Sequence, residues 1–197
     1  MALPLFLLLS YLLGSLSTAV ILSRLMGLPD PRQQGSGNPG ASNLLRSGHR
    51  WLAVVVLVGD ILKAVFPLLL AQNIGLDTFQ IACLGVATCL GHAFPLFFQF
   101  RGGKSVATAL GSLVIIAWPL GLLVLAIWLL VFARYRYASL ASIVAAISTP
   151  ILALYWAPSQ SYWPINVMAA LLISRHYANL KRLWQGKELS VYTSPQS

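Results

Sequence analysis

The chain has 197 residues, of which 58% are hydrophobic and 9% are charged, and its formal net charge at pH 7 is +9. Its mean hydropathy is +0.78, and soluble domains are only about half apolar, so the composition excludes an ordinary soluble domain. A basic chain often binds nucleic acid, but here the basic residues are split among short gaps between apolar stretches. This arrangement favours a membrane surface and anionic small molecules, and no nucleic acid.

Six apolar stretches could cross a membrane, and they cover residues 2–23, 51–71, 78–98, 105–133, 138–157 and 164–174. Only the second contains charged residues in its interior, namely Asp60 and Lys63. The fourth stretch would be roughly 43 Å long as one helix, which exceeds a hydrocarbon core of about 30 Å. Trp118-Pro119-Leu120-Gly121 is expected to break it, because proline removes a donor and glycine permits a turn. Two helices there would place all the loop and terminal Lys and Arg residues on one face of the membrane.

The positive-inside tendency therefore predicts an all-α, polytopic membrane helical bundle with seven transmembrane helices. The N-terminus is expected outside and the C-terminus in the cytoplasm. We predict one membrane domain over residues 1–188 and a C-terminal tail over 189–197, whose order the sequence leaves open. Three cytoplasmic connections follow, at about 24–50, 99–105 and 134–138, and each leads into a helix whose N-terminus favours anions.

The first connection contains a run rich in glycine, serine and asparagine from Gly35 to Arg46. Its glycines and small polar side chains predict backbone N–H groups that converge on an oxyanion, and Arg46 adds a planar, bidentate donor. A flexible surface turn is the alternative interpretation. The candidate residues of this connection are Ser36, Gly37, Asn38, Gly40, Asn43 and Arg46.

The second connection reads Arg101-Gly102-Gly103-Lys104-Ser105 and resembles the end of a Walker A loop. The resemblance fails, because the first glycine of that pattern would fall at Phe98 and no strand precedes it. What remains is a turn at a helix start, with Lys104 as a point charge for phosphate. A positive-inside anchor is the alternative, and the candidate residues are Gly102, Gly103, Lys104, Ser105 and Thr108.

Two further groups of polar residues lie in or beside apolar stretches. Ser139 and Ser142 are three residues apart and share a helix face, although such serines often serve only packing. On the last helix, Arg175, Asn179 and Arg182 fall within about 60° of one another, with His176 at the edge of that face. Ionisable groups at such a position indicate a functional site, and a solvated helix end is the alternative.

The acidic residues of the chain contribute little to this expectation. Asp60 and Lys63 are one helical turn apart, and we favour a structural pair that joins helices. His92 is ambiguous. The four acids are too sparse for a Ser-His-Asp set or a metal site, so we expect no metal, no cofactor and no carboxylate base in the mechanism.

Three blocks of the chain resemble the bacterial acyl-phosphate:glycerol-3-phosphate acyltransferase family of integral membrane enzymes. The family pattern Gly-Ser-Gly-Asn-x-Gly-x-Thr-Asn-x-x-Arg lies on Gly35 to Arg46 and departs only at Ser42. The pattern Gly-Gly-Lys-Gly-x-Ala-Thr lies on Gly102 to Thr108, with Ser105 in place of glycine. The third, Arg-His-x-x-Asn-x-x-Arg-Leu-x-x-Gly-x-Glu, is matched fully by Arg175 to Glu188.

The resemblance implies transfer of a fatty acyl group from acyl phosphate to the 1-hydroxyl of glycerol 3-phosphate, which gives lysophosphatidic acid and phosphate. It implies seven spans in the bacterial cytoplasmic (inner) membrane, with the active site facing the cytoplasm. It also implies that acyl-CoA and acyl carrier protein are not donors. A soluble acyl-phosphate-forming enzyme is the expected functional partner.

On this basis Lys104, Ser142, His176 and Arg46 are expected to hold glycerol phosphate, and Ser36, Gly37, Asn38 and Asn43 the acyl phosphate. Asn179 would orient His176 or bind phosphate. The base is either His176 or a substrate phosphate, and the lack of carboxylates favours the phosphate. A transporter of phosphorylated metabolites and a membrane lipid phosphatase are the rival interpretations.

Overall fold

The computed structural model describes residues 2–190, and all regular structure in that range is helical. The predicted all-α class is therefore confirmed, while most of the tail predicted at 189–197 lies outside the described residues. The α-helices are α1 (Ala2–Gly14), α2 (Thr18–Leu25), α3 (Ala41–Arg46), α4 (Arg50–Asn73), α5 (Thr78–Ala93), α6 (Val106–Ile116), α7 (Trp118–Tyr135), α8 (Ala138–Trp156), α9 (Tyr162–Arg175) and α10 (Tyr177–Trp184). Short 3-10 helices η1, η2 and η3 cover Pro31–Gln33, Leu96–Phe98 and Ser159–Ser161.

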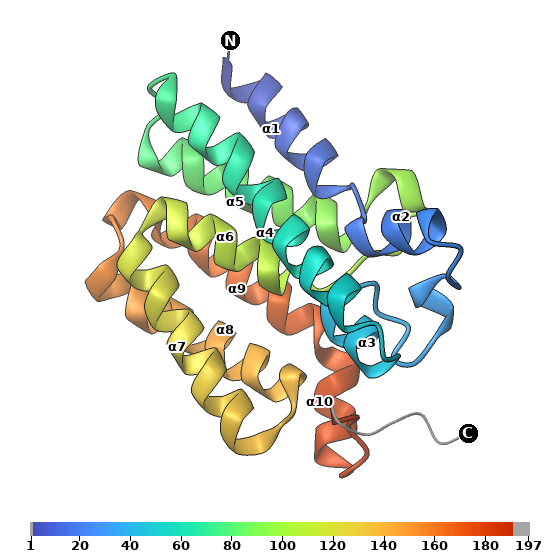
Figure 1. Cartoon of the computed structure of the whole chain (residues 1–197). Helices are drawn as coiled ribbons and strands as arrows, with labels where there is room; N and C mark the ends of the chain where they lie inside the picture. Colours follow the sequence, from blue (N-terminus) through green and yellow to red (C-terminus); the bar gives the residue numbers. More distant parts are fainter. Residues whose placement is uncertain (1, 191–197) are drawn as a thin grey trace.

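The long helices form a bundle in which α1 packs on α5, α4 on α6, and α8 on both α7 and α9 (Figure 1). The short helices α3 and α10 lie at the same end of this bundle (Figure 1). Contacts between Arg32 and the Phe98 carbonyl, and between Lys104 and Asn179, join the first connection, the second connection and α10. The polar connections are thus gathered at one end of the molecule.

Four helices among the described residues are long and apolar enough to cross a membrane, namely α4, α5 with η2, α7 and α8. The bent pair of α1 and α2 would make a fifth, and α6 is apolar but has only 11 residues. The count of seven spans therefore stays a prediction. Both α4 and α8 contain an internal proline, Pro67 and Pro150, which neighbouring helices can accommodate in a membrane bundle.

The predicted break in the fourth apolar stretch is confirmed, although it lies one residue earlier than expected. Ala117 adopts an extended conformation between α6 and α7, and Pro119 occupies the first turn of α7. Proline is tolerated there because the first N–H groups of a helix have no partner within the helix. Gly121 lies inside α7, where an added Cβ would clash with the Val114 backbone, so its role is close packing and not a turn.

The first apolar stretch, expected as one span over 2–23, is also broken. Helices α1 and α2 are bent by 45° at Ser15–Ser17, and the Ser15 hydroxyl donates to the Tyr11 carbonyl. Such back-bonding by serine bends helices. The bend turns α2 away from the axis of α1 (Figure 1).

The last helix differs from the expectation in a way that matters for the site. It is interrupted at His176, so that α9 ends at Arg175 and α10 starts at Tyr177. The predicted face shared by Arg175, Asn179 and Arg182 is therefore wrong for Arg175, because it assumed one uninterrupted helix, whereas Asn179 and Arg182 both lie on α10 and both donate to Glu188. Arg175 contacts the second connection, whereas Arg182 pairs with Glu188.

Close packing of α1 on α5 depends on two glycines. A Cβ at Gly14 would lie 2.2 Å from the Thr88 carbonyl oxygen, and one at Gly91 would lie 2.1 Å from the Tyr11 carbonyl oxygen. Only glycine permits backbones to approach so closely, which is a common device between membrane helices. This contact places the C-terminal end of α5, with His92, beside the bend between α1 and α2.

Candidate active site

A cavity of about 560 Å³ lies between α4, α6, α7, α8 and α9, with polar residues of the connections at one end. The rest of its wall is mainly apolar and includes Leu113, Val124, Trp128 and Met168. Eleven of the predicted site residues line it. They are Ser36, Asn38, Gly40, Asn43, Arg46, Lys104, Ser105, Ser139, Ser142, His176 and Asn179.

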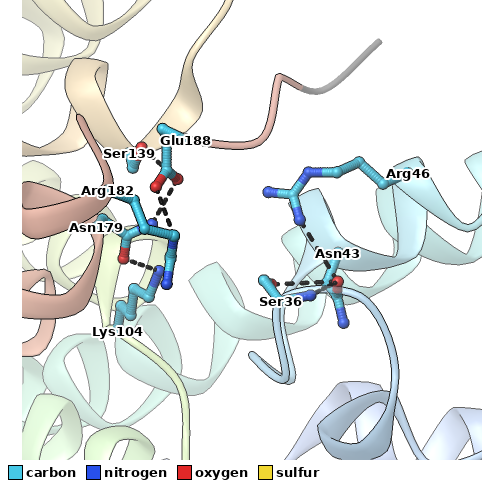
Figure 2. Close-up of polar contacts among 8 residues, drawn as sticks. All are labelled: Ser36, Asn43, Arg46, Lys104, Ser139, Asn179, Arg182 and Glu188. Carbon is cyan, nitrogen blue, oxygen red and sulfur yellow. Dashed lines mark hydrogen bonds and ion pairs between the residues drawn. The ribbon is translucent and has the colours of Figure 1, made fainter. Parts of the chain in front are cut away.

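A chain of hydrogen bonds joins Lys104 to α8 on one side of this cavity. Lys104 Nζ donates to Asn179 Oδ1 at 2.6 Å, and Asn179 Nδ2 donates to Glu188 Oε1 at 2.6 Å. Glu188 also accepts from Ser139 Oγ at 2.9 Å and from Arg182 Nε at 2.9 Å. Figure 2 shows these residues as one cluster, which we call the Lys104 cluster (Lys104, Ser139, Asn179, Arg182 and Glu188).

The expectation of a site without carboxylates is wrong, because Glu188 holds the Lys104 cluster together and Asp60 lines the cavity. Glu188 is the cluster residue that was absent from the candidates. Its side chain is only 3% exposed, and Gly186 at φ +66° turns the chain back so that it reaches Asn179 and Ser139. Its place at the end of the third motif was the available signal. Because three groups donate to it, this carboxylate serves as an anchor for neighbouring donors.

The first connection supplies a second group on the opposite side of the cavity. Asn43 Oδ1 accepts from the backbone N–H and the hydroxyl of Ser36 at 3.0 and 3.2 Å, and from Arg46 Nη1 at 3.5 Å. Figure 2 shows the Arg46 guanidinium pointing across open space toward Glu188 and Arg182. Arg46 lines the cavity, and its buried Nε has no hydrogen-bond partner among the described residues, so its guanidinium has donors left for a ligand.

Backbone N–H groups of the first connection were expected to converge on a ligand, and for three of these groups that prediction is wrong. Ser36 N–H donates to the Asn43 side chain, Gly37 N–H to the Gln34 carbonyl and Gly40 N–H to the Asn38 carbonyl. Asn43 Nδ2 also donates to the carbonyls of Pro31 and Gln34. Asn43 therefore organises the loop, and the groups left to face a ligand are the side chains of Ser36, Asn38 and Arg46.

Gly102, Gly103 and Arg175 meet one another but do not line the main cavity. Arg175 Nε donates to the Gly103 carbonyl at 3.1 Å, and its Nη2 donates to the Gly102 carbonyl at 3.2 Å. The guanidinium also lies over the Phe94 ring, 5.1 Å from its centroid. Gly37, Gly102 and Arg175 line a separate polar cavity of about 460 Å³. The two bonds from Arg175 position the second connection.

Ser105 and Thr108, both predicted to bind substrate, are fully buried. Ser105 Oγ donates to the Cys89 carbonyl at 2.7 Å, and the residue adopts φ +60°, a left-handed conformation that favours glycine. Its hydroxyl thus holds the start of α6 against α5 and is not free to bind a ligand. Thr108 lies inside α6 and lines neither cavity.

The two serines on α8 have different partners. Ser139 donates to Glu188, whereas Ser142 Oγ donates to the Ala138 carbonyl at 2.8 Å and accepts from Trp128 Nε1 at 3.0 Å. Trp128 lies on α7 in the apolar part of the wall. Ser142 therefore sits where the polar end of the cavity meets the apolar part.

Burial determines the charge of the two titratable groups at the centre of the site. It lowers the pKa of Lys104 to about 8, and it lowers the pKa of His176 to about 4, with help from the nearby Lys104 ammonium. His176 Nδ1 lies 2.8 Å from the Leu172 carbonyl, which can only accept, so Nδ1 carries the proton. At neutral pH the ring is uncharged and Nε2 presents its lone pair.

Residues 4–186 match the family described as Glycerol-3-phosphate acyltransferase. The chain belongs to this family. A glycerol-3-phosphate acyltransferase of Pasteurella multocida is 45% identical over 187 residues, which cover 95% of this chain and 92% of the relative. One from Actinobacillus pleuropneumoniae is 47% identical over 179 residues, and 91% of each chain is covered.

Two solved structures of PlsY (YgiH), an integral membrane glycerol 3-phosphate acyltransferase, share the fold of this family member. The glycerol 3-phosphate form superimposes with a TM-score of 0.91 at 37% identity, covering 96% of each chain. The lysophosphatidic acid form superimposes with a TM-score of 0.88 at 36% identity, covering 96% of this chain and 95% of the other. The chain is therefore an acyltransferase and an integral membrane protein.

Proposed function

We propose that the chain transfers a fatty acyl group from acyl phosphate to the 1-hydroxyl of glycerol 3-phosphate. The products are lysophosphatidic acid and inorganic phosphate. One observation carries the proposal: a single cavity joins a polar end with Lys104 and Arg46 to a long apolar wall. Such a cavity suits two phosphates and a fatty chain, and the related PlsY structures are described in glycerol 3-phosphate and lysophosphatidic acid forms.

Glycerol phosphate is proposed to bind between Lys104, Arg46, Ser142 and His176. The Lys104 ammonium has three donors, and Asn179 accepts from only one, so the others are available for phosphate oxygens. The Arg46 guanidinium on the opposite side points toward the same space (Figure 2). Two cations facing each other across a cavity favour a dianion between them.

The acyl donor is proposed to place its phosphate near Ser36 and Asn38, in the loop that Asn43 organises, with its chain along the apolar wall. Gly37 lines the other cavity and is left out of this contact. The apolar wall lets the fatty chain pass from lipid into the cavity without being exposed to water. Leu125, Trp128 and Leu129 on α7 and Leu113 on α6 supply this wall. The acyl carbonyl would then lie where the polar and apolar parts meet, beside Ser142.

In the chemical step the 1-hydroxyl oxygen bonds to the acyl carbon, and the bond from that carbon to the phosphate oxygen breaks. The carbonyl oxygen becomes an oxyanion, for which the Asn38 amide is the proposed donor. The Ser36 hydroxyl would join it by exchanging its bond to Asn43 Oδ1 for one to the substrate. The hydroxyl proton passes to a phosphate and leaves with the product. Holding the hydroxyl about 3 Å from an activated carbonyl supplies much of the acceleration.

The proton acceptor is proposed to be a substrate phosphate. His176 has a pKa of about 4, whereas the second pKa of a phosphate monoester is about 6, so the phosphate is roughly a hundredfold stronger as a base. His176 lines the cavity, and the lone pair of its Nε2 would accept a hydrogen bond from the glycerol hydroxyl and orient it. His176 thereby positions the nucleophile.

We further propose seven spans with the N-terminus outside and the polar connections in the cytoplasm of a bacterium, facing the inner leaflet of its inner membrane. The seven apolar helices α1, α4, α5, α6, α7, α8 and α9 would each cross once. A soluble enzyme that forms acyl phosphate is the proposed source of the donor. No cofactor or metal takes part in the proposed step.

The test is to supply the purified protein with labelled glycerol 3-phosphate and either palmitoyl phosphate or palmitoyl-CoA. We expect labelled lysophosphatidic acid with palmitoyl phosphate only, and its loss in Lys104→Ala. Equal rates with palmitoyl-CoA would contradict the proposed donor, and no product with either donor would contradict the proposed reaction. Lys187→Ala, an exposed lysine beyond α10, is the control.

A further inference from the structure

Three ionisable side chains form a buried cluster to which the proposed function assigns no role, although two of them, Asp60 and His92, also line the main cavity. Asp60, Lys63 and His92 are 4%, 9% and 8% exposed and lie in the interior of α4 and α5. Lys63 Nζ lies 2.9 Å from Asp60 Oδ1 and 2.6 Å from His92 Nδ1, and it donates to the Leu16 carbonyl at 3.3 Å. The three donors of the ammonium thus have three acceptors.

The cluster is fixed at one end by the bend between α1 and α2. The Thr18 hydroxyl donates to Asp60 Oδ1 at 3.1 Å, and the Leu16 carbonyl is the third acceptor for Lys63. Because His92 Nδ1 accepts from Lys63, its Nε2 carries the ring proton and the orientation of the ring is set.

At its other end the cluster holds the residue before Lys104. The Gly103 N–H donates to the His92 carbonyl at 3.0 Å, and a Cβ at Gly103 would lie 2.0 Å from His92 Nε2. The Gly103 carbonyl accepts from Arg175. His92 therefore contacts the backbone of Gly103 through both its carbonyl and its ring, and Lys104 is the next residue.

An ion pair in a membrane interior is costly unless every charge has partners, and structural contacts between helices could be made by neutral residues. The direct contact with Gly103 gives this cluster a further consequence. A shift of His92 would move the start of the Lys104 side chain, and displacements near 1 Å are enough to impair a binding site.

We propose that Asp60, Lys63 and His92 are positioning residues that fix Gly103 so that the Lys104 ammonium faces the acceptor phosphate. This inference rests on the proposed role of Lys104 in holding glycerol 3-phosphate. The cluster acts through backbone placement, because Lys104 itself bonds to Asn179 and not to any of the three.

The experiment compares His92→Asn, Lys104→Ala and the double variant, in steady-state assays with palmitoyl phosphate and glycerol 3-phosphate. Asparagine keeps an acceptor for Lys63 but removes the ring that contacts Gly103. We expect His92→Asn to raise KM for glycerol 3-phosphate about tenfold, with kcat and the donor KM nearly unchanged. In the Lys104→Ala background, His92→Asn should alter the KM for glycerol 3-phosphate by less than about twofold, because the effects of substitutions at coupled residues do not add.

Thr88→Val is the matched control, because Thr88 is equally buried on α5 and its hydroxyl bonds only to the Leu84 carbonyl. We expect it to leave both KM values unchanged. The positioning role would be overturned if folded His92→Asn had an unchanged KM for glycerol 3-phosphate or showed a fall in kcat alone. It would also be overturned if the two KM effects multiplied in the double variant. If Lys104→Ala itself leaves KM unchanged, the proposed function of Lys104 fails instead.

Gly103→Ala provides a second route if His92→Asn does not fold. It adds a methyl group at the contact with His92 Nε2 without changing any charge. We expect a similar rise in KM for glycerol 3-phosphate and the same loss of effect in the Lys104→Ala background. A KM equal to that of the unsubstituted protein would overturn the inference.

Discussion

At the scale of single residues, burial gives Lys104 and His176 protonation states suited to phosphate chemistry. The Lys104 ammonium, with a pKa of about 8, is mostly charged at neutral pH, and His176, with a pKa of about 4, is neutral. A lowered pKa means that a basic group loses its proton at a lower pH than usual. Lys104 therefore loses its charge above about pH 8, and His176 stays uncharged down to about pH 4.

The pH profile tests Lys104. We expect kcat/KM for glycerol 3-phosphate to fall as pH rises through about 8, because kcat/KM reports the free enzyme and neutral Lys104 no longer attracts phosphate. Lys104→Arg should lose this alkaline fall, since a guanidinium stays charged in this range. Lys181→Arg, an exposed change on α10, should keep it. An alkaline fall retained in Lys104→Arg would mean that another group causes it.

The role of His176 is tested at acid pH. If a substrate phosphate is the base, kcat/KM should fall below about pH 6 with the second ionisation of glycerol 3-phosphate. His176→Asn should leave that acid limb in place and lower kcat by about tenfold through poorer orientation of the hydroxyl. A loss of a hundredfold or more in kcat, or an altered acid limb, would instead identify His176 as the base.

At the scale of helices, interruptions bring the polar clusters together. The bend at Ser15–Ser17 delivers the first connection to the polar end of the bundle, and the break at His176 separates Arg175 from Asn179 and Arg182. Arg175 can then hold the second connection while Asn179 faces Lys104. One straight helix would place all three side chains on one face and leave the second connection without this contact.

Close packing of α1 on α5 is expected to control stability. Gly14→Val would place side-chain atoms against the Thr88 carbonyl and should lower the thermal unfolding midpoint in detergent, because overpacking typically costs about 1–3 kcal/mol. Ala133→Val, at an exposed position on α7, is the matched small-to-valine control. An unfolding midpoint equal to that of the control would show that the two helices can separate without cost.

At the scale of the whole molecule, the proposed orientation places every polar connection on one side of the membrane. Single cysteines at exposed positions Gln34 and Lys187 should react with an impermeant thiol reagent only from the cytoplasmic side. Cysteines at Asn73 and Gln160 should react only from outside. The background would carry Cys83→Ala and Cys89→Ala. Labelling of Gln34→Cys and Lys187→Cys from opposite sides would contradict a single cytoplasmic site.

The site was only partly predictable, and the reason differs from residue to residue. Lys104, His176 and Asn179 belong to short motifs beside apolar stretches, so local sequence identified them. Ser105 and Thr108 belong to the same motifs, but neighbouring helices bury them. Ser105 bonds to the Cys89 carbonyl on α5, and Thr108 lies inside α6 away from both cavities, and no local pattern encodes either placement.

The sequence by itself determined that the chain is a helical membrane protein with phosphate-binding motifs between its apolar stretches, because hydropathy, proline and motif spacing are local properties. Only the tertiary structure decided which polar groups meet. Glu188 reaches Ser139, and His92 reaches Lys63 and Gly103, across long separations in the chain. Such pairings depend on how helices bend and pack, and burial then sets the charge of the groups they enclose.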